Sequence, residues 1–265
     1  MLSLAENQSL SGTKSSLSKA LNLLVVIAER GRNGITVSSA AKRSGIHVAT
    51  AHRLMTALVE EDFLSFDPYT KLYHLGLMPY EIVARAGSDL EFLVLRKSLH
   101  PVLERVQAEV GGVASLSVIS RNEALCVDVI EGQSDISLNT LKVGSRRPLG
   151  AGAASLSLLA ALGEEEREAV IQRESERYRK YGNLTAEFVR AACAELPENG
   201  HVFNAQIIPG IGAVGVPLFT AAGALACAVS ITNTVSRLSP ERRRDIALAL
   251  VQAARAAGFQ AMDIA

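Results

Sequence analysis

The chain has 265 residues, a length that suits one large domain or two small ones. Hydrophobic residues make up 48% of it and charged residues 20%, so a packed core is expected and wholesale disorder is excluded. Its 27 basic and 27 acidic side chains balance, which excludes a globally basic nucleic-acid coat protein but permits a local basic patch.

The spacing of the cysteines, the length of the apolar runs and the absence of catalytic motifs predict where the protein resides and which chemistry it lacks. Cys126, Cys193 and Cys227 lie far apart without a CxxC pair, which excludes a zinc ribbon and fits a reducing cytoplasm. No signal peptide and no apolar run of about 18 residues is found, so no membrane span is expected. Because the chain has no HExxH, P-loop or G-x-S-x-G motif, we expect no enzyme, no metal and no cofactor.

Changes in residue composition along the sequence predict an α+β chain with two domains. Residues 1–14 are small and polar and predict a flexible tail. Residues 15–78 are helical with short loops, and residues 79–95 predict a linker helix region. Residues 96–265 alternate β-rich runs with helices and predict a second domain.

The first predicted helix begins at Ser15 or Ser16, either of which can cap it, and ends near Gly31. Its apolar residues recur at i, i+3, i+4, i+7, i+8 and i+11, which predicts one buried stripe. The stripe consists of Leu17, Ala20, Leu21, Leu24, Val25 and Ala28.

Two short helices and a strand pair follow and predict a winged helix-turn-helix. Thr36 can cap a helix that ends at the tight turn Ser44-Gly45, and a third helix runs from about His47 to Glu61. The third helix is expected to bury Ala51, Leu54, Met55 and Leu58. Strands over 63–66 and 71–74 flank a turn with Pro68 at its second position, which is typical of a wing.

Basic side chains gather on the third predicted helix and its approach. No acidic residue lies between Lys42 and Arg53, whereas Glu60, Glu61 and Asp62 occupy the far end. This asymmetry favours a helix whose N-terminal half faces the phosphates of a DNA groove. The alternatives are a winged helix that binds protein, a His52 that only packs and an Arg53 paired with a nearby acid. The candidate DNA-binding residues are Lys42, Arg43, Thr50, His52, Arg53 and Lys71.

The second domain predicts an antiparallel sheet with helices packed on it. A long helix over 90–110 is expected to bury Leu95, Leu99, Val102 and Val106, and a charged helix over 164–180 is expected to be solvated. Ser239-Pro240 opens a terminal helix. A further helix is predicted over 153–162, and strands over 113–120, 124–130, 136–143, 201–207, 213–219 and 224–232.

One apparent nucleotide motif is discarded. Residues 210–215 match GxGxxG, but the β-like segment 216–219 follows with a proline where the dinucleotide fold needs a helix. The glycines are interpreted as letting the backbone bend beside a pocket.

An ordered set of motifs resembles the IclR-type family of bacterial transcriptional regulators. The set begins with SLSKAL at 16–21, GIHVATAHRL at 45–54 and YHLG at 73–76. It continues with VGSRRPL at 143–149, PGI at 209–211, VPLF at 216–219 and SIT at 230–232. The resemblance implies a winged helix, a linker helix and a GAF-like α/β effector-binding domain. It also implies a homodimer or a dimer of dimers on double-stranded operator DNA.

The resemblance also implies a pocket for a small carboxylate effector between the start of the first effector-domain helix and a glycine-rich strand pair. Many relatives carry an acid where this chain has Asn204, and the small residues here leave room for an aromatic or other medium-sized carboxylate. Arg147 could be its counter-ion or serve a subunit contact. The implied effector-binding residues are Asn139, Arg147, Ala153, Ala154, Asn204, Ile211, Ala213, Ser230 and Thr232.

Overall fold

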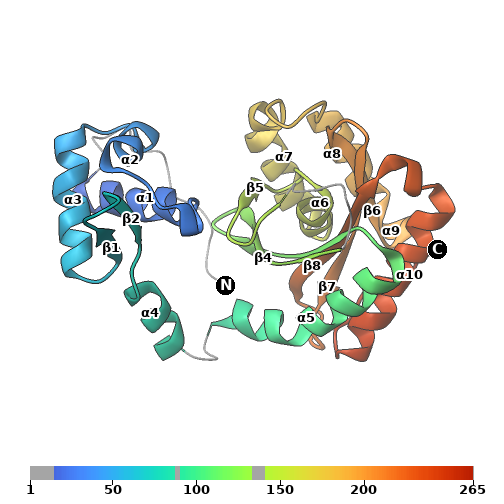
Figure 1. Cartoon of the computed structure of the whole chain (residues 1–265). Helices are drawn as coiled ribbons and strands as arrows, with labels where there is room; N and C mark the ends of the chain where they lie inside the picture. Colours follow the sequence, from blue (N-terminus) through green and yellow to red (C-terminus); the bar gives the residue numbers. More distant parts are fainter. Residues whose placement is uncertain (1–14, 87–89, 133–140, 265) are drawn as a thin grey trace. The chain divides into compact units, whose positions relative to one another are not determined.

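The computed structural model describes residues 15–86, 90–132 and 141–264. These residues fall into two compact units, one ending at Asp89 and the other beginning at Leu90, and each unit is described by itself (Figure 1). The predicted tail over 1–14 and the candidate residue Asn139 lie outside the described residues.

The first unit is a winged helix-turn-helix. Its hairpin pairs antiparallel from Leu64 opposite Leu75 to Asp67 opposite Leu72. Ile35 joins the hairpin through a β-bridge, in which it exchanges two backbone hydrogen bonds of 2.9 and 3.0 Å with Tyr73. Its elements are α1 (Ser16–Ala28), α2 (Val37–Ser44), α3 (Val48–Glu60), β1 (Leu64–Asp67), β2 (Leu72–Leu75) and α4 (Met78–Ala86).

Local capping sets the helix boundaries in this unit. The Ser15 hydroxyl accepts from the Ser18 amide at 3.1 Å, and the Thr36 hydroxyl accepts from the Ser39 amide at 3.3 Å. Gly45 ends α2 with a φ of +66°, a left-handed conformation that glycine adopts without steric cost. This turn sets α3 against α2, as the sequence predicts.

The predicted buried face of α1 is wrong. The described structure buries Leu23, Val26 and Ile27, whereas the predicted stripe is largely exposed: Leu17 by 69%, Leu21 by 53% and Val25 by 59%. Apolar residues lie all around this helix, so periodicity could not select one face. The core formed by Ile35, Met55, Leu64 and other residues of the unit makes that selection.

The second unit is built on one antiparallel sheet with the strand order β5-β4-β3-β8-β7-β6. Neighbouring strands in this order are paired antiparallel. The strands are β3 (Val113–Ser120), β4 (Glu123–Glu131), β5 (Arg146–Pro148), β6 (Val202–Ile208), β7 (Ile211–Phe219) and β8 (Leu225–Thr234).

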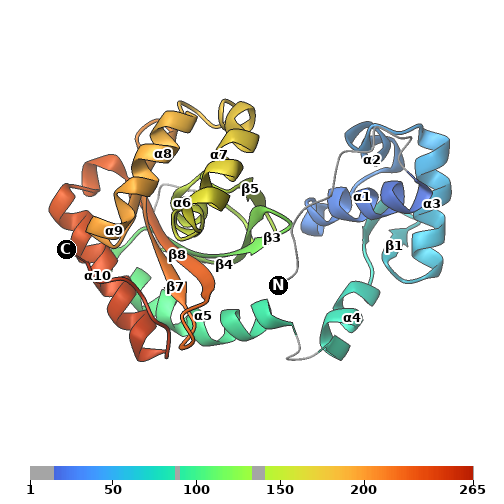
Figure 2. The ribbon, with the colours of Figure 1, turned by 180° about the vertical axis from the view of Figure 1, so that it is seen from behind.

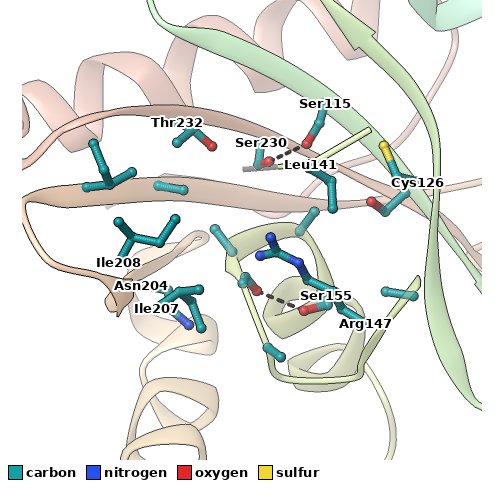
Figure 3. Close-up of a pocket in the computed structure, with 18 of the residues that line it drawn as sticks. Ser115, Cys126, Leu141, Arg147, Ser155, Asn204, Ile207, Ile208, Ser230 and Thr232 are labelled. Atoms are coloured by element: carbon teal, nitrogen blue, oxygen red, sulfur yellow. Dashed lines mark hydrogen bonds between the residues drawn. The ribbon is translucent and has the colours of Figure 1, made fainter. Parts of the chain in front are cut away.

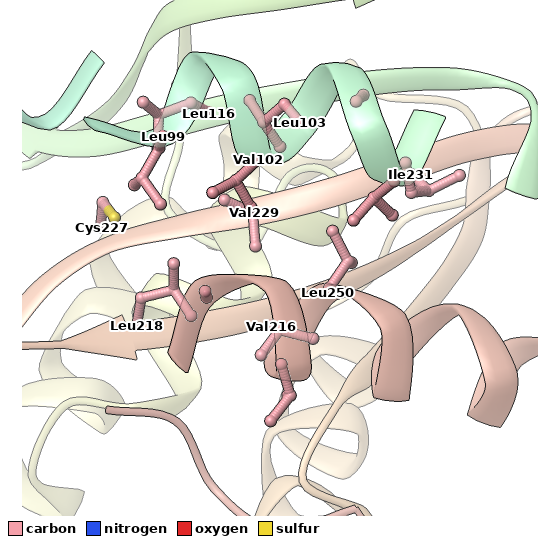
Figure 4. Packing of buried hydrophobic residues seen from close by; sticks show 14 of the residues in the cluster. Leu99, Val102, Leu103, Leu116, Val216, Leu218, Cys227, Val229, Ile231 and Leu250 are labelled. Atoms are coloured by element: carbon pink, nitrogen blue, oxygen red, sulfur yellow. The ribbon is translucent and has the colours of Figure 1, made fainter. Parts of the chain in front are cut away.

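Helices cover both faces of this sheet (Figure 2). α5 (Glu91–Val110) and α10 (Pro240–Ala256) share one core with it, and Figure 4 shows Leu99, Val229 and Leu250 meeting there. The second core holds α6 (Ala153–Ala160), α7 (Glu164–Tyr178) and α8 (Ala186–Ala194), and the short α9 (Leu196–Asn199) follows. None of the helices in the described ranges has the length and apolarity needed to cross a membrane.

Two predictions for the second unit need correction. Of the strand expected over 136–143, only residues 141–143 are described, and they form no strand; the edge strand is β5 instead. The helix expected to be solvated buries Val170, Ile171, Glu174 and Tyr178, because α8 packs against it. The α8 segment lies where the sequence patterns assigned no element.

The GxGxxG segment runs directly into strand β7, with no helix after it. Gly215 is required there because α6 lies against the strand: a Cβ atom on Gly215 would come within 2.5 Å of the Ala153 carbonyl oxygen. The glycine therefore permits a close helix–sheet contact, and this contact holds the start of α6 in place.

Candidate DNA-binding surface and ligand cavity

The candidate DNA-binding side chains lie on three elements of the winged helix. Lys42 and Arg43 are exposed in the last turn of α2, and His52 and Arg53 are exposed on α3. Lys71 is exposed in the turn of the wing, with a φ of +59°. Thr50 is half-buried at the border of the exposed face of α3. The fold thus presents a cationic surface around the first half of α3.

The exposed face of α3 holds further side chains that motif reasoning missed. Val48, Ala49 and Thr56 are exposed on it, while Ala51 and Leu54 face the core. The 3.6-residue period of the buried positions was the signal that could have identified them. A methyl group on such a face can contact a thymine methyl in a major groove.

Hydrogen bonds hold the turn of the wing. The two carboxylate oxygens of Asp67 accept from the Tyr69 amide at 2.8 Å and from the Thr70 hydroxyl at 2.7 Å. These bonds keep the pKa of Asp67 below its usual value, with the Thr70 hydroxyl as the largest cause. Lys71 follows directly and is therefore presented by an ordered turn.

The second unit contains a cavity between the sheet and the start of α6 (Figure 3). Together with the open solvent at its mouth, its empty space amounts to about 610 Å³. Its polar lining residues are Ser115, Ser117, Cys126, Arg147, Ser155, Asn204, Ser230 and Thr232. Its apolar and glycine lining residues are Ala124, Leu141, Ala151, Gly152, Ala153, Ala154, Ile207, Ile208, Ile211, Gly212 and Ala213.

The first turn of α6 lines this cavity. The Leu156 amide donates to the Gly152 carbonyl at 2.8 Å as the first intrahelical bond. The amides of Ala153 and Ala154 precede it, in the turn where an α-helix provides no internal acceptor. Together with the helix dipole, such amides favour a bound anion. Gly152, with a φ of +113°, allows the chain to enter the helix there.

Arg147 supplies the charge of the cavity. It is the one charged side chain among the lining residues that the structure describes, and no acidic side chain lies among them. Burial lowers the pKa of its guanidinium, which nevertheless stays protonated at neutral pH because arginine begins from a very high value. Figure 3 shows the Arg147 side chain extending between the sheet and the start of α6.

The sheet provides neutral polar groups on the opposite wall. Ser115 on β3 and Ser230 on β8 are direct cross-strand neighbours, and their hydroxyl oxygens lie 2.8 Å apart. Burial raises the pKa of the Cys126 thiol to about 12, so this thiol is neutral at physiological pH. Among the described lining residues, the cavity therefore combines one cation with uncharged donors and acceptors.

Eight of the nine effector-binding residues expected from the sequence line this single cavity, and the ninth, Asn139, is outside the described residues. Sequence reasoning missed the β3–β4 wall, including Ser115, Ser117 and Cys126. Ser115 and Ser117 alternate with an apolar residue, as Ser230 and Thr232 do, and this shared period of two was the available signal.

The described parts of the chain contain no assembled site for a metal ion or for acid–base catalysis. No group of three or more His, Cys, Asp or Glu side chains there could hold a metal ion. His100 pairs with buried Asp128 at 2.6 Å, and the His201 ring contacts the Asn199 carbonyl at 2.9 Å. Neither histidine lines the cavity.

Both units match one protein family. The "IclR helix-turn-helix domain" matches residues 16–68, and the "Bacterial transcriptional regulator IclR C-terminal" domain matches residues 88–258. The chain therefore belongs to the IclR family of bacterial regulators. It is a DNA-binding transcriptional regulator and not an enzyme, which decides against the protein-interaction alternative.

Curated relatives cover most of the chain. The HTH-type transcriptional regulator KipR of Bacillus subtilis is 30% identical over 210 residues, which span 78% of this chain and 82% of KipR. The transcriptional repressor IclR of Escherichia coli is 23% identical over 248 residues, which span 92% of this chain and 89% of the repressor.

Solved structures share the fold. An IclR regulator of Alicyclobacillus acidocaldarius aligns with a TM-score of 0.73 at 24% identity and covers 92% of this chain and 97% of its own. An IclR homologue of Microbacterium hydrocarbonoxydans, solved as a complex with 4-hydroxybenzoate, aligns with a TM-score of 0.72 at 25% identity. The alignment covers 91% of this chain and all of the homologue.

Proposed function

We propose that a small carboxylate effector binds in the cavity of the second unit and thereby modulates how this regulator binds its operator. The observation that carries the proposal is that Arg147, the one charged side chain among the described lining residues, and the first turn of α6 line the same cavity. A carboxylate supplies the complementary negative charge.

The DNA-binding residues have two proposed roles. Arg53 and Thr50 on α3 contact base edges, because a guanidinium can donate two bonds to guanine and a hydroxyl suits several bases. Lys42, Arg43 and Lys71 contact phosphates, which position the protein without specifying a sequence. His52 is exposed on α3 beside Arg53 and serves either purpose.

The proposed effector is an aromatic or other medium-sized carboxylate. Support comes from the small residues Ala153, Ala154 and Ala213, which leave room for more than a two-carbon acid. A relative of similar fold binds 4-hydroxybenzoate, and this is a property of that relative. The proposed effector-binding set, apart from Asn139, is Arg147, Ala153, Ala154, Asn204, Ile211, Ala213, Ser230 and Thr232.

The proposed assembly is a homodimer or a dimer of dimers in the cytoplasm, where the operator DNA lies. One winged helix reads one half-site, so two copies place their third helices in major grooves about 34 Å apart or a multiple of that. The exposed stripe Leu17, Leu21 and Val25 supplies an apolar face for a second copy. The segment 79–95 is proposed as the linker through which the bound effector shifts the spacing or orientation of the third helices of the two copies. The extent of this shift is set by the difference between the effector's affinities for the two arrangements of these helices.

The test is a fluorescence-anisotropy titration of labelled upstream DNA at two salt concentrations, with benzoate, 4-hydroxybenzoate, pyruvate and succinate added separately. We expect specific binding that weakens with salt and a change in affinity with at least one acid. Arg53→Ala should weaken specific binding tenfold or more, whereas Arg179→Ala, an exposed arginine of the second unit, should not. Specific binding that no acid changes would reject the effector proposal and retain the DNA role.

A further inference from the structure

Val48 is an apolar side chain that the folded winged helix leaves uncovered. It is the first residue of α3, its side chain is 48% exposed, and it lies outside the core of its unit. Ala49 follows it and is exposed as well. Valine is also a weaker helix former than alanine, because its branched Cβ atom restricts the side chain in a helix. Neither core packing nor local helix stability therefore accounts for an exposed valine at this position.

The exposed face of α3 begins with these two aliphatic residues. Val48, Ala49, His52, Arg53 and Thr56 are exposed along this face. Their spacings of three and four residues bring their side chains together on one side of the helix. The elements that pack against α3 within the unit include α1, α2 and β1, which lie on its other side (Figure 1). The aliphatic residues thus start a face that is directed away from the core of the unit.

The first turn of α3 is the part of the domain that is expected to meet DNA bases. In a helix-turn-helix, the N-terminal residues of the second helix contact base edges in the major groove. Here α3 is that helix, because it follows α2 and the Gly45 turn within the matched domain over 16–68. Polar base edges would face Val48 without forming hydrogen bonds, which is costly when water is removed from them.

Thymine is the base whose major-groove edge suits an aliphatic side chain. Its C5 methyl group is the apolar group on that edge, whereas guanine, adenine and cytosine present hydrogen-bond donors and acceptors there. Ala49 is small beside Val48, so it adds no polar group and allows the helix to approach the base closely. The chemistry of the first turn therefore favours a thymine as the base opposite Val48.

The position of Arg53 adds a spacing to this preference. Residues 49 and 53 are separated by about 6 Å along the helix axis, and successive base pairs by about 3.4 Å along the duplex. A base that the first turn contacts therefore lies within about two base pairs of a base that Arg53 contacts. Guanine is the base to which a guanidinium donates two hydrogen bonds.

We propose that Val48 determines operator specificity by contacting the C5 methyl group of a thymine that lies within about two base pairs of the guanine bound by Arg53. The recognised group is a methyl on a pyrimidine ring, so 5-methylcytosine at the same position supplies it as well. Val48 thus selects a base without providing a charge or a hydrogen bond. This inference rests on the proposed contact of α3 with base edges and narrows the operator sequence.

Removal of the thymine methyl groups from DNA tests the inference. Wild-type full-length protein enriches a duplex from a random-sequence library, and the duplex is then amplified with either thymidine or deoxyuridine triphosphate. Deoxyuridine retains the base pairing and lacks the C5 methyl group. We expect deoxyuridine to weaken binding in fluorescence anisotropy about fourfold for each half-site, or about fifteenfold for two, the effect of leaving one methyl group per half-site unburied.

Single substitutions of deoxyuridine then locate the contacted thymine in each half-site. At that position, wild-type protein should bind a 5-methylcytosine–guanine pair about fourfold tighter than a cytosine–guanine pair, because the two differ by the same methyl group. The enriched sequence should also carry a guanine within about two base pairs of this thymine.

Variants of Val48 assign the methyl contact to this side chain. Val48→Ser and Val48→Gln both replace the aliphatic group, and in either variant the loss caused by deoxyuridine should fall below twofold. Two variants keep the test informative if one of them fails to fold, which circular dichroism would report. Val143→Ala is the matched control, because it shortens an exposed valine of the second unit and should keep the full loss.

Arg53→Ala distinguishes the failure of this inference from the failure of the proposed function. If Arg53→Ala weakens binding while wild-type protein binds the two duplexes equally, the methyl contact is wrong and α3 remains the recognition helix. A full deoxyuridine effect in the Val48 variants would also overturn the inference. If neither Arg53→Ala nor the Val48 variants weaken binding to the enriched duplex, the proposed contact of α3 with base edges fails, and the inference fails with it.

Discussion

At the scale of single residues, Asp128 joins the wall of the cavity to helix α5. In the β3–β4 pairing, Leu116 lies opposite Asp128 and the next residue, Ser117, lies opposite Cys126, so Val127 is the extra residue of a β-bulge. Cys126 lines the cavity, whereas Val127 packs in the core beneath α5 and Asp128 bonds that helix. Because of the bulge, the consecutive side chains of Val127 and Asp128 both lie on the α5 face of the sheet.

The Asp128 carboxylate is buried and charge-paired. One oxygen lies 2.6 Å from Nδ1 of His100, and the other lies 3.3 Å from Nε of Arg96 and accepts from the Val129 amide at 3.1 Å. Both partners, His100 and Arg96, belong to α5 and are partly exposed. Because the carboxylate itself is removed from water, these contacts are worth more than those of a surface ion pair.

We predict that Asp128→Asn lowers the free energy of unfolding of the second unit by about 1–3 kcal/mol, because it keeps the shape and removes the charge from buried bonds. Glu104→Gln is the matched control, since Glu104 is an exposed partner of the same histidine at 3.5 Å. Its effect should stay below about 1 kcal/mol. Urea titration followed by circular dichroism measures both values, and equal losses would show that burial of Asp128 does not matter.

The sequence correctly predicted cavity-lining positions where hydroxyl side chains recur with the period of two of a β-strand. Ser230 and Thr232 alternate along one strand, and the structure places both in the lining. The bulge that puts Cys126 and Asp128 on opposite faces has no comparable signal, because two residues separated by one normally share a face. Residues such as Ser115 and Asp128 therefore acquire their surroundings only through the strand pairing.

At the scale of elements, helix α1 leaves an apolar stripe uncovered in its own unit. Leu17, Leu21 and Val25 lie one turn apart on one face and are each more than half exposed. A continuous apolar face of this kind marks an interaction surface. A second copy of the chain is the occupant we propose, since reading two half-sites requires two winged helices.

We predict that Leu21→Glu lowers the mass of the assembly in solution and weakens operator binding. A buried carboxylate at the centre of an apolar interface would lack a counter-charge, whereas the folded monomer would tolerate it because the position is exposed. Ser16→Glu introduces the same charge on the same helix away from the stripe and should leave the mass unchanged. Light scattering coupled to gel filtration reports the mass, and identical masses for both variants would reject this face as the interface.

The same helix shows where periodicity stops being informative. The predicted stripe and the buried residues Leu23, Val26 and Ile27 are equally apolar, so the sequence specifies a helix without specifying its inward face. In α5, by contrast, polar residues alternate with Leu95, Leu99, Val102 and Val106, and all four are buried as predicted. An amphipathic helix predicts its own orientation, and an apolar one depends on its partners.

At the scale of the whole molecule, most of the elements were predictable from the sequence, whereas helix α8 and the edge strand β5 were not. The winged helix followed from caps, a glycine turn and a hairpin, each of which is a local signal. Strand β5 is three residues long and pairs with β4 from a distant part of the chain, so no local pattern announces it. Of the strand expected over 136–143, the described residues 141–143 form none, and Arg146–Pro148 is the strand that pairs with β4 at the edge of the sheet.

The salt dependence of operator binding reports how many copies act together. Lys71 is exposed on the wing, and we propose that it contacts a phosphate in each copy bound to DNA. Each phosphate contact contributes about −0.9 to the slope of log K against log salt concentration. Lys71→Ala should therefore reduce the slope by about 2 for a dimer and by about 4 for a dimer of dimers with four bound wings.

A comparison of binding to operator DNA and to unrelated DNA distinguishes the role of Lys71 from that of Arg53. Lys71→Ala should weaken binding to operator and unrelated DNA by similar factors, because phosphates carry no sequence information. Arg53→Ala should weaken operator binding more than binding to unrelated DNA, because it removes a base contact. An unchanged slope in Lys71→Ala would remove the wing from the interface. A slope change of about 1 would mean that a single wing is engaged, and the stripe on α1 would then need another occupant.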